Sequence, residues 1–174
     1  MTQQPQSGRS AWMARAQWDA RVRGDECFFC TELNERVESN ELFIRIADLQ
    51  VSQLRLATDQ TVRGYCVLIA TTHVTEPFEL GVSGSRAYFE DLMLAARVLT
   101  KVFEPDKMNY QILGNLVPHL HCHLHPRYYG DLWPGAPAGS EIEPVLLSPE
   151  EYLDRVTLIR RALIEAADRS LYRG

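Results

Sequence analysis

Apolar residues gather in five short stretches of the chain, at alternate positions in some and as a continuous run in others, which is the pattern of β-strands. The five predicted strands lie at about Leu42–Ile46, Gln50–Leu56, Tyr65–Thr71, Met108–Leu113 and Val117–His125. Most of them are separated by short turns, and only one gap is long enough to hold a helix. The pattern therefore predicts an antiparallel sheet.

Two longer segments carry apolar residues at helical spacing. The first runs from about Ser85 to Val102 and places one apolar stripe at Tyr88, Leu92, Ala95, Leu99 and Val102. The second begins at Ser148-Pro149-Glu150-Glu151, with an N-capping serine, proline at the first helical position and glutamate at the third, and runs to about Asp168. We therefore expect an α+β fold: a five-stranded antiparallel sheet with a long intervening helix and a C-terminal helix.

The ends of the chain are expected to flank one central domain. Residues 1–26 comprise a polar tail and an amphipathic docking helix at about Ser10–Val22, which carries Trp12 and Trp18. Residues 27–131 hold the predicted sheet. Residues 132–174 add a loop, part of the Pro- and Gly-rich stretch Tyr129–Leu147, and the C-terminal helix of the same domain.

Composition narrows the possible partners. The 174 residues are 45% hydrophobic with a net charge of −5, which suits one domain and offers no general basic surface for nucleic acid. No apolar run reaches the roughly 18 residues of a membrane span, and the N-terminus lacks the apolar core of a signal peptide. We therefore expect a cytoplasmic protein with no membrane partner, whose four cysteines are thiols or metal ligands.

Four of the five histidines lie within seven residues, at positions 119, 121, 123 and 125. In an extended strand these four side chains point to one face, while Leu120, Cys122 and Leu124 point to the other. Alternate residues on one face stand about 6 to 7 Å apart, since a strand rises about 3.3 Å per residue. Such a row suits a phosphate chain or a metal, so the segment is the candidate functional site.

The flanks of this row match a known signature. Gly114-Asn115 precedes it and Pro126-Arg127 follows it. The segment resembles the histidine triad family, whose signature is His-x-His-x-His, and in particular bacterial members related to diadenosine polyphosphate hydrolases. Matching both flanks makes the triad His119, His121 and His123. The rival register, His121, His123 and His125, would put Pro126-Arg127 at two usually apolar positions.

The resemblance implies that the middle histidine, His121, is the nucleophile toward the α-phosphorus of a nucleotide. One of its ring nitrogens must then be bare, and a hydrogen bond from the other nitrogen to a backbone carbonyl would fix that tautomer. His119 and His123 would flank the phosphoryl oxygens, with His119 nearer the leaving oxygen. Neutral donors and one local cation would hold the substrate phosphates: Asn109, Asn115, Val117 and Arg127.

A second cluster of candidate ligands is Cys27-Phe28-Phe29-Cys30 together with His73, the one histidine outside the row. Two thiols alone do not complete a zinc site. The resemblance to zinc-bearing branches of the superfamily implies a closed structural site of Cys27, Cys30, His73 and His119, and His119 would then orient its strand instead of acting as an acid. A reduced cysteine pair without metal is the alternative. A thioredoxin-like role is disfavoured, because the pair lacks a preceding strand and a following helix. No organic cofactor is expected.

The resemblance further implies a homodimer whose sheets join across a two-fold axis. Three departures from the family pattern weaken the transfer of function. Tyr65-Cys66 stands where many members have Gly-His, which removes one histidine contact. Ala57 followed by Thr58 stands where an asparagine often contacts the ribose, and His125 occupies a usually apolar position.

The sequence thus predicts a nucleotide phosphohydrolase or nucleotidyl transferase that forms a nucleotidyl-His121 intermediate. Its substrate would be a dinucleoside polyphosphate, a phosphoramidate or a nucleotide-sugar-like ester, and water, phosphate or another ester would be the acceptor. One alternative is a nucleotide-binding or scaffold protein without turnover. Another is a metal-dependent enzyme of the cupin type, although such enzymes need a glutamate a few residues after the histidine pair and none is present here.

Overall fold

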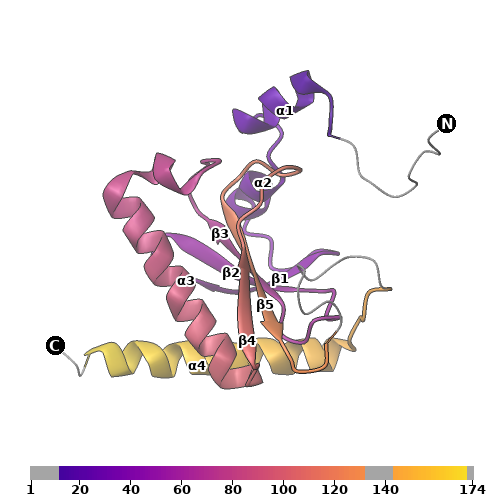
Figure 1. Ribbon diagram of the computed structural model, residues 1–174, viewed down its shortest axis with the longest axis vertical. Coiled ribbons are helices and arrows are strands. Elements are labelled where there is room, and N and C mark those ends of the chain that lie inside the picture. The colour runs from indigo at the N-terminus through magenta and orange to yellow at the C-terminus, as the bar shows by residue number, and fades with distance from the viewer. Residues whose placement is uncertain (1–11, 132–142, 172–174) are drawn as a thin grey trace, which may run out of the picture.

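Five antiparallel strands form a single sheet in the computed structural model, which describes residues 12–131 and 143–171 (Figure 1). The strands are β1 (Phe43–Asp48), β2 (Ser52–Ala57), β3 (Cys66–Ala70), β4 (Lys107–Gln111) and β5 (His121–Arg127). Their spatial order is β1-β2-β3-β5-β4, and each neighbouring pair is antiparallel. The predicted α+β class and its five-stranded antiparallel sheet are therefore confirmed.

Two long helices, α3 (Gly81–Phe103) and α4 (Pro149–Leu171), pack against one face of this sheet. In Figure 1, α4 crosses the end of α3 at a steep angle. The predicted stripe of α3 faces inward, and Tyr88, Leu92, Ala95 and Leu99 are buried in the main core. From the sheet this core takes the inward residues of β2, β3 and β5, including Leu68, Cys122 and Leu124.

The opposite face of the sheet is covered at one end by a short helix, α2 (Phe28–Asn34), and above it lies α1 (Arg15–Val22) (Figure 1). Phe29 of α2 packs with Phe43, Val67 and Ile69 in a second, smaller apolar cluster. A buried ion pair anchors α2, because Nη1 of the fully buried Arg55 on β2 donates to Oε2 of Glu32 at 2.9 Å.

Several boundaries differ from the sequence-based prediction. Helix α2 and the 3-10 turn η1 (Pro77–Leu80) were not predicted, since each is too short to show a helical apolar stripe. The predicted strand Val117–His125 starts later, at His121, because its approach contains Pro118 and the amide of Leu120 bonds outside the sheet, to the carbonyl of Val74 at 2.6 Å.

The C-terminal helix begins as its capping pattern indicates. Pro149 is the first helical residue, the amide of Glu151 donates to Oγ of Ser148, and the amide of Ser148 donates to the carboxylate of Glu151. The tail Met1–Arg9 and residues 132–142 of the predicted loop lie outside the described residues. Among the helices described, none combines the length and apolar character needed to span a membrane.

Candidate active site and metal site

The alternation predicted for the histidine row is confirmed. Strand β5 lies between β3 and β4, so hydrogen bonds occupy both of its edges and its side chains can point only to the two faces. Leu120, Cys122 and Leu124 enter the main core. The histidines share the other face, where His121 lies opposite Ile69 and His123 lies opposite Val67 of β3. We call this side the histidine face.

His121 has one ring nitrogen engaged and the other bare. Its Nδ1 donates to the backbone carbonyl of His119 at 2.6 Å, and its Nε2 has no hydrogen-bond partner among the described residues. Phe29 covers the ring, with centroids 5.0 Å apart. Burial lowers the pKa of His121, so the imidazole is neutral at pH 7. A neutral imidazole with a bare Nε2 is a competent nucleophile.

His123 and His125 continue the row toward the end of β5, where they meet Tyr65. The hydroxyl of Tyr65 lies 2.6 Å from Nδ1 of His123. The Tyr65 ring stacks on His125 with centroids 4.2 Å apart and planes at 15°. Burial lowers the pKa of each of these two histidines to about 4, and the positive charge of Arg127 adds to the effect at His125. Both rings are therefore neutral near pH 7.

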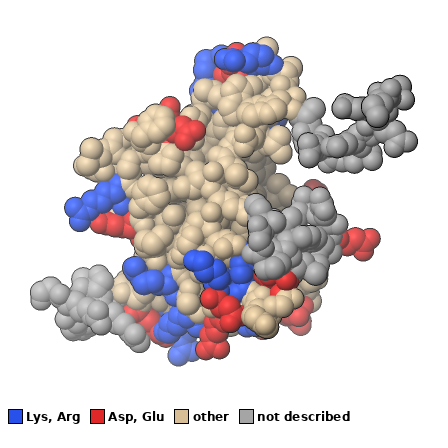
Figure 2. All heavy atoms as spheres, viewed as in Figure 1, with Lys and Arg blue, Asp and Glu red and all other residues tan. Residues whose placement is uncertain are grey.

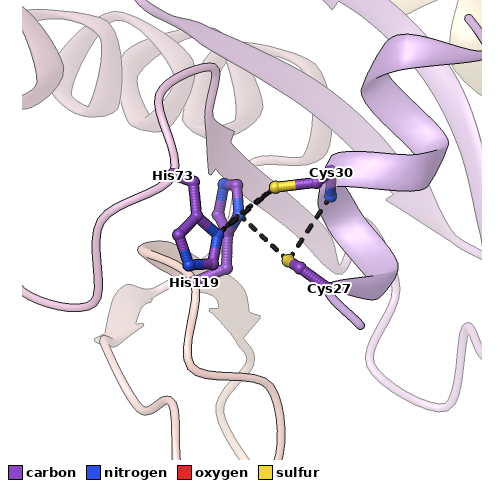
Figure 3. A group of neighbouring side chains, drawn as sticks. All are labelled: Cys27, Cys30, His73 and His119. Atoms are coloured by element: carbon purple, nitrogen blue, oxygen red, sulfur yellow. Dashed lines mark hydrogen bonds between the residues drawn. The ribbon is translucent and has the colours of Figure 1, made fainter. Parts of the chain in front are cut away.

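Four potential metal ligands converge beside this row (Figure 3). Cys27 and Cys30 lie at the start of α2, His73 follows β3, and His119 precedes β5. Their ligand atoms all lie within 4.8 Å of one another. Nδ1 of His119 is 3.3 Å from Sγ of Cys27, 3.5 Å from Sγ of Cys30 and 3.2 Å from Nδ1 of His73. The four residues thus form a compact two-sulfur, two-nitrogen set.

Both histidines of this set have their outer nitrogen fixed by a backbone carbonyl. Nε2 of His119 donates to the carbonyl of Ala70 at 2.7 Å, and Nε2 of His73 donates to that of Val22 at 2.9 Å. Each Nδ1 is therefore the bare nitrogen, and each faces the two sulfurs. The one proton of a neutral His119 is thus held on Nε2 by the carbonyl of Ala70, and Nδ1 has none to give to a leaving group.

The spacing of this set fits a tetrahedral ion. Around a tetrahedral zinc with bonds of about 2.0 to 2.3 Å, ligand atoms stand about 3.3 to 3.8 Å apart, which is close to the contacts of 3.2 to 3.5 Å made by His119, within a set that spans at most 4.8 Å. Burial and the neighbouring Cys27 raise the pKa of the Cys30 thiol to about 12, so the thiol needs a cation to ionise near pH 7.

The sequence-based argument against a thioredoxin-like redox pair was wrong on one point. The cysteine pair was expected to lack a following helix, but helix α2 begins directly after Cys27.

The remaining predicted site residues are more scattered. Arg127 is held by both carboxylate oxygens of Asp131, at 2.5 and 2.9 Å, and by Oδ1 of Asn109 at 2.9 Å. These three residues line a cavity of about 450 Å³ near the end of β5. Asn115 is exposed in the loop before β5, and Val117 is half-buried with its carbonyl accepting from the amide of His119 at 2.8 Å.

A family model described as the HIT domain, for histidine triad, matches residues 44–130 and so includes the whole histidine row. The chain belongs to the HIT family. No protein with a curated description matches the sequence.

Solved structures of HIT proteins share the fold. A histidine triad protein from Sinorhizobium meliloti is 27% identical, with 74% of this chain and 93% of that chain covered and a TM-score of 0.64. One from Bradyrhizobium japonicum is 22% identical, with 88% and 99% covered and a TM-score of 0.64. A Zn-bound histidine triad family protein from Mycobacterium smegmatis is 20% identical, with 83% and 98% covered and a TM-score of 0.61. The last two likenesses show the fold alone.

Two of the noted departures have structural consequences. Cys66 is fully buried in the main core, so the residue on the histidine face is Tyr65, and its hydroxyl supplies a contact where none was expected. Ala57 ends β2 and is buried, which leaves no polar side chain at that position. The alternation of β3 carried the signal for Tyr65, because it shares a face with Val67 and Ile69.

Phe29 was also missed as a site residue. Its ring contacts both His119 and His121, with centroids 5.7 and 5.0 Å away. It lies inside the singled-out Cys27–Cys30 segment, but only the short helix α2 turns it toward the histidines.

The depressed pKa of His125 predicts a loss of stability in acid. The unfolded state takes up a proton near pH 6.5 but the folded state only near pH 4, so falling pH between these values favours unfolding. On going from pH 7 to pH 5, the His125→Leu variant should lose about 2 kcal/mol less unfolding free energy than the wild type. Urea denaturation at both pH values measures this. Equal losses in the two proteins would contradict the buried neutral imidazole.

Proposed function

We propose that this HIT protein is a nucleotide phosphohydrolase or nucleotidyl transferase that acts at the α-phosphorus through a nucleotidyl-His121 intermediate. The observation that carries the proposal is the 2.6 Å hydrogen bond from Nδ1 of His121 to the carbonyl of His119. That bond fixes the proton on Nδ1 and leaves the Nε2 lone pair available, which is what nucleophilic attack at phosphorus requires. Membership of the HIT family supports a nucleotide as substrate.

In the proposed first step, the Nε2 lone pair of His121 forms a bond to the α-phosphorus. The bond from phosphorus to the leaving group breaks, and the leaving group departs with its electron pair and is protonated by solvent. In the second step, water, phosphate or another ester attacks the same phosphorus, and the phosphorus–nitrogen bond breaks to restore the lone pair of His121. His123 lies beside His121, with ring centroids 4.9 Å apart, and contacts a phosphoryl oxygen.

We assign His119 a positioning role in this scheme. Its side chain belongs to the set of Cys27, Cys30 and His73, and its carbonyl accepts the proton that sets the tautomer of His121. We propose that this set holds a structural zinc, an ion that here serves to order α2 and the approach to β5. The donor spacing and the Zn-bound relative from Mycobacterium smegmatis support this assignment.

The two other functions considered from the sequence receive less support. In the described part of the chain, the cluster of three or more potential metal ligands does not include His121, His123 or His125, so nothing there favours a cupin-type metal centre. A binding protein without turnover would not require a bare, oriented nitrogen on His121. It remains an outcome of the first test below.

Trapping the intermediate tests the mechanism. The wild-type protein would be mixed with labelled substrates of three kinds, a dinucleoside polyphosphate, a nucleoside phosphoramidate and a nucleotide sugar, and quenched without acid. We expect a nucleotide on His121 that is labile to acid and stable to base, and a loss of at least about a thousandfold in turnover for His121→Ala, because the nucleophile is removed. His125→Leu should be mild by comparison.

Each other outcome of that experiment has a defined meaning. Label on His123 would establish the rival register. Normal turnover by His121→Ala, in protein whose thermal unfolding matches the wild type, would exclude the covalent mechanism. Binding of the nucleotides without turnover would leave the non-catalytic alternative.

Metal content tests the zinc site. Purified protein should carry about one zinc per chain, and Cys30→Ser should lose most of it and unfold at a lower temperature, because metal binding free energy adds to folding free energy. Cys66→Ala is the matched control, since this buried cysteine lies in the core on the other face and should leave the zinc content unchanged. Metal-free wild-type protein of undiminished stability would disprove the site.

We also propose that β4 joins two copies into a dimer. Among the described elements β4 pairs only with β5, so its other edge is open. Tyr110 on β4 is an exposed large apolar residue, and the exposed Met93 of α3 lines the same surface hollow. Figure 2 shows a broad surface without Lys, Arg, Asp or Glu across the middle of the molecule, with charged side chains at its left edge, at the top and along the lower part.

A charge at this edge should separate the copies. Wild-type protein should sediment at about twice the chain mass of 19.9 kDa, and Tyr110→Asp should sediment as a monomer, because the added carboxylates would face each other at the joint. Leu153→Asp, at an exposed apolar position on α4, is the control that should remain dimeric. A monomeric wild type would refute the dimer.

A further inference from the structure

Three rings on the histidine face lie nearly parallel: those of Tyr65, His123 and His125. The plane of Tyr65 is 29° from that of His123 and 15° from that of His125, and the two imidazoles differ by 18°. Tyr65 directly precedes Cys66, the first residue of β3, and Cys66 lies opposite Leu124 of β5. The sheet register therefore brings the tyrosine beside His125, while its hydroxyl reaches His123.

The hydrogen bond between Tyr65 and His123 has a preferred direction. Burial raises the pKa of Tyr65, so its hydroxyl keeps its proton near pH 7. A phenol is a strong donor and a weak acceptor, whereas a bare imidazole nitrogen is a strong acceptor. The contact of 2.6 Å is therefore an O–H donated to Nδ1 of His123. Since a neutral imidazole carries one proton, that proton is then on Nε2.

His125 holds Tyr65 in place by stacking on its ring. Its Nδ1 is buried without a hydrogen-bond partner in the described structure, which is a cost that a leucine in the same space would not carry. What the imidazole adds is a flat ring, stacked on Tyr65 at a centroid distance of 4.2 Å. Stacking restricts rotation of the tyrosine about its side-chain bonds and so keeps the hydroxyl on His123.

We infer that Tyr65 is a positioning residue: its hydroxyl fixes the proton of His123 on Nε2 and so makes His123 a donor, with His125 as the ring that holds the tyrosine in place. That this donor contacts a phosphoryl oxygen of the substrate rests on the proposed function. The tautomer of His123 does not, because it is a property of the protein without substrate.

The tautomer is measured directly by nuclear magnetic resonance. Long-range proton–nitrogen correlations on the ¹⁵N-labelled full chain at pH 7 should show Nδ1 of His123 unprotonated and hydrogen-bonded, and Nε2 protonated. In Tyr65→Phe the Nδ1 signal should move to that of an unbonded nitrogen and the second tautomer should appear. Tyr88→Phe removes a hydroxyl from the other face of the sheet, where it donates to the carbonyl of Leu68, and should change neither signal.

Two results of that measurement would overturn the inference. One is a wild-type His123 with its proton on Nδ1. The other is an unchanged His123 spectrum in Tyr65→Phe. Both are read without turnover, so they stand or fall separately from the proposed mechanism.

Kinetics on whichever of the three substrate kinds is turned over provides a second test. Tyr65→Phe should lower kcat by about 10- to 100-fold, the usual effect of losing an orienting partner, while KM changes by less than about threefold. The double variant with His125→Leu should be no slower than Tyr65→Phe alone, because the stacked ring acts only through the hydroxyl. Fully additive losses would contradict the role of His125, and a loss confined to KM would contradict that of Tyr65.

Discussion

The position of β5 between two hydrogen-bonded neighbours is the constraint on which the site depends. With both edges occupied, its side chains have only two directions available, and adjacent residues must take opposite ones. Cys122 and Leu124 occupy the core under α3 and α4, which commits His121, His123 and His125 to the other face. The same alternation in β3 brings Tyr65 to that face. The core packing of one side of the sheet thus fixes the chemistry of the other.

Sequence periodicity was enough to predict the sheet, the two long helices and the face on which the histidines lie, because each depends on a repeat of several residues. It did not predict α2, whose seven residues hold too few apolar positions to show a helical period. It also extended the strand of β5 over Pro118 and His119, which lie in the loop before it. Local pattern therefore located the histidine row but not the segments that cover it.

The details of the candidate site depend on groups that carry no sequence signature. The carbonyls of His119, Ala70 and Val22 select the nitrogen that each histidine leaves bare, and any residue type could supply them. The role of Tyr65 depends on register, since a shift of one residue would move its hydroxyl to the core. The family resemblance suggested which residues meet, while the hydrogen bonds that set their protonation came from the fold.

The distance along the chain between the ligands of the proposed metal site bears on how the protein is made. Cys27 and His119 are 92 residues apart, so during synthesis the cysteine pair leaves the ribosome long before its last partner. At about 5 to 20 residues per second, that interval lasts roughly 5 to 18 s. Throughout it both thiols are open to oxidants and to competing metals. The cysteine pair therefore stays without its last partner until the histidine row has been synthesised.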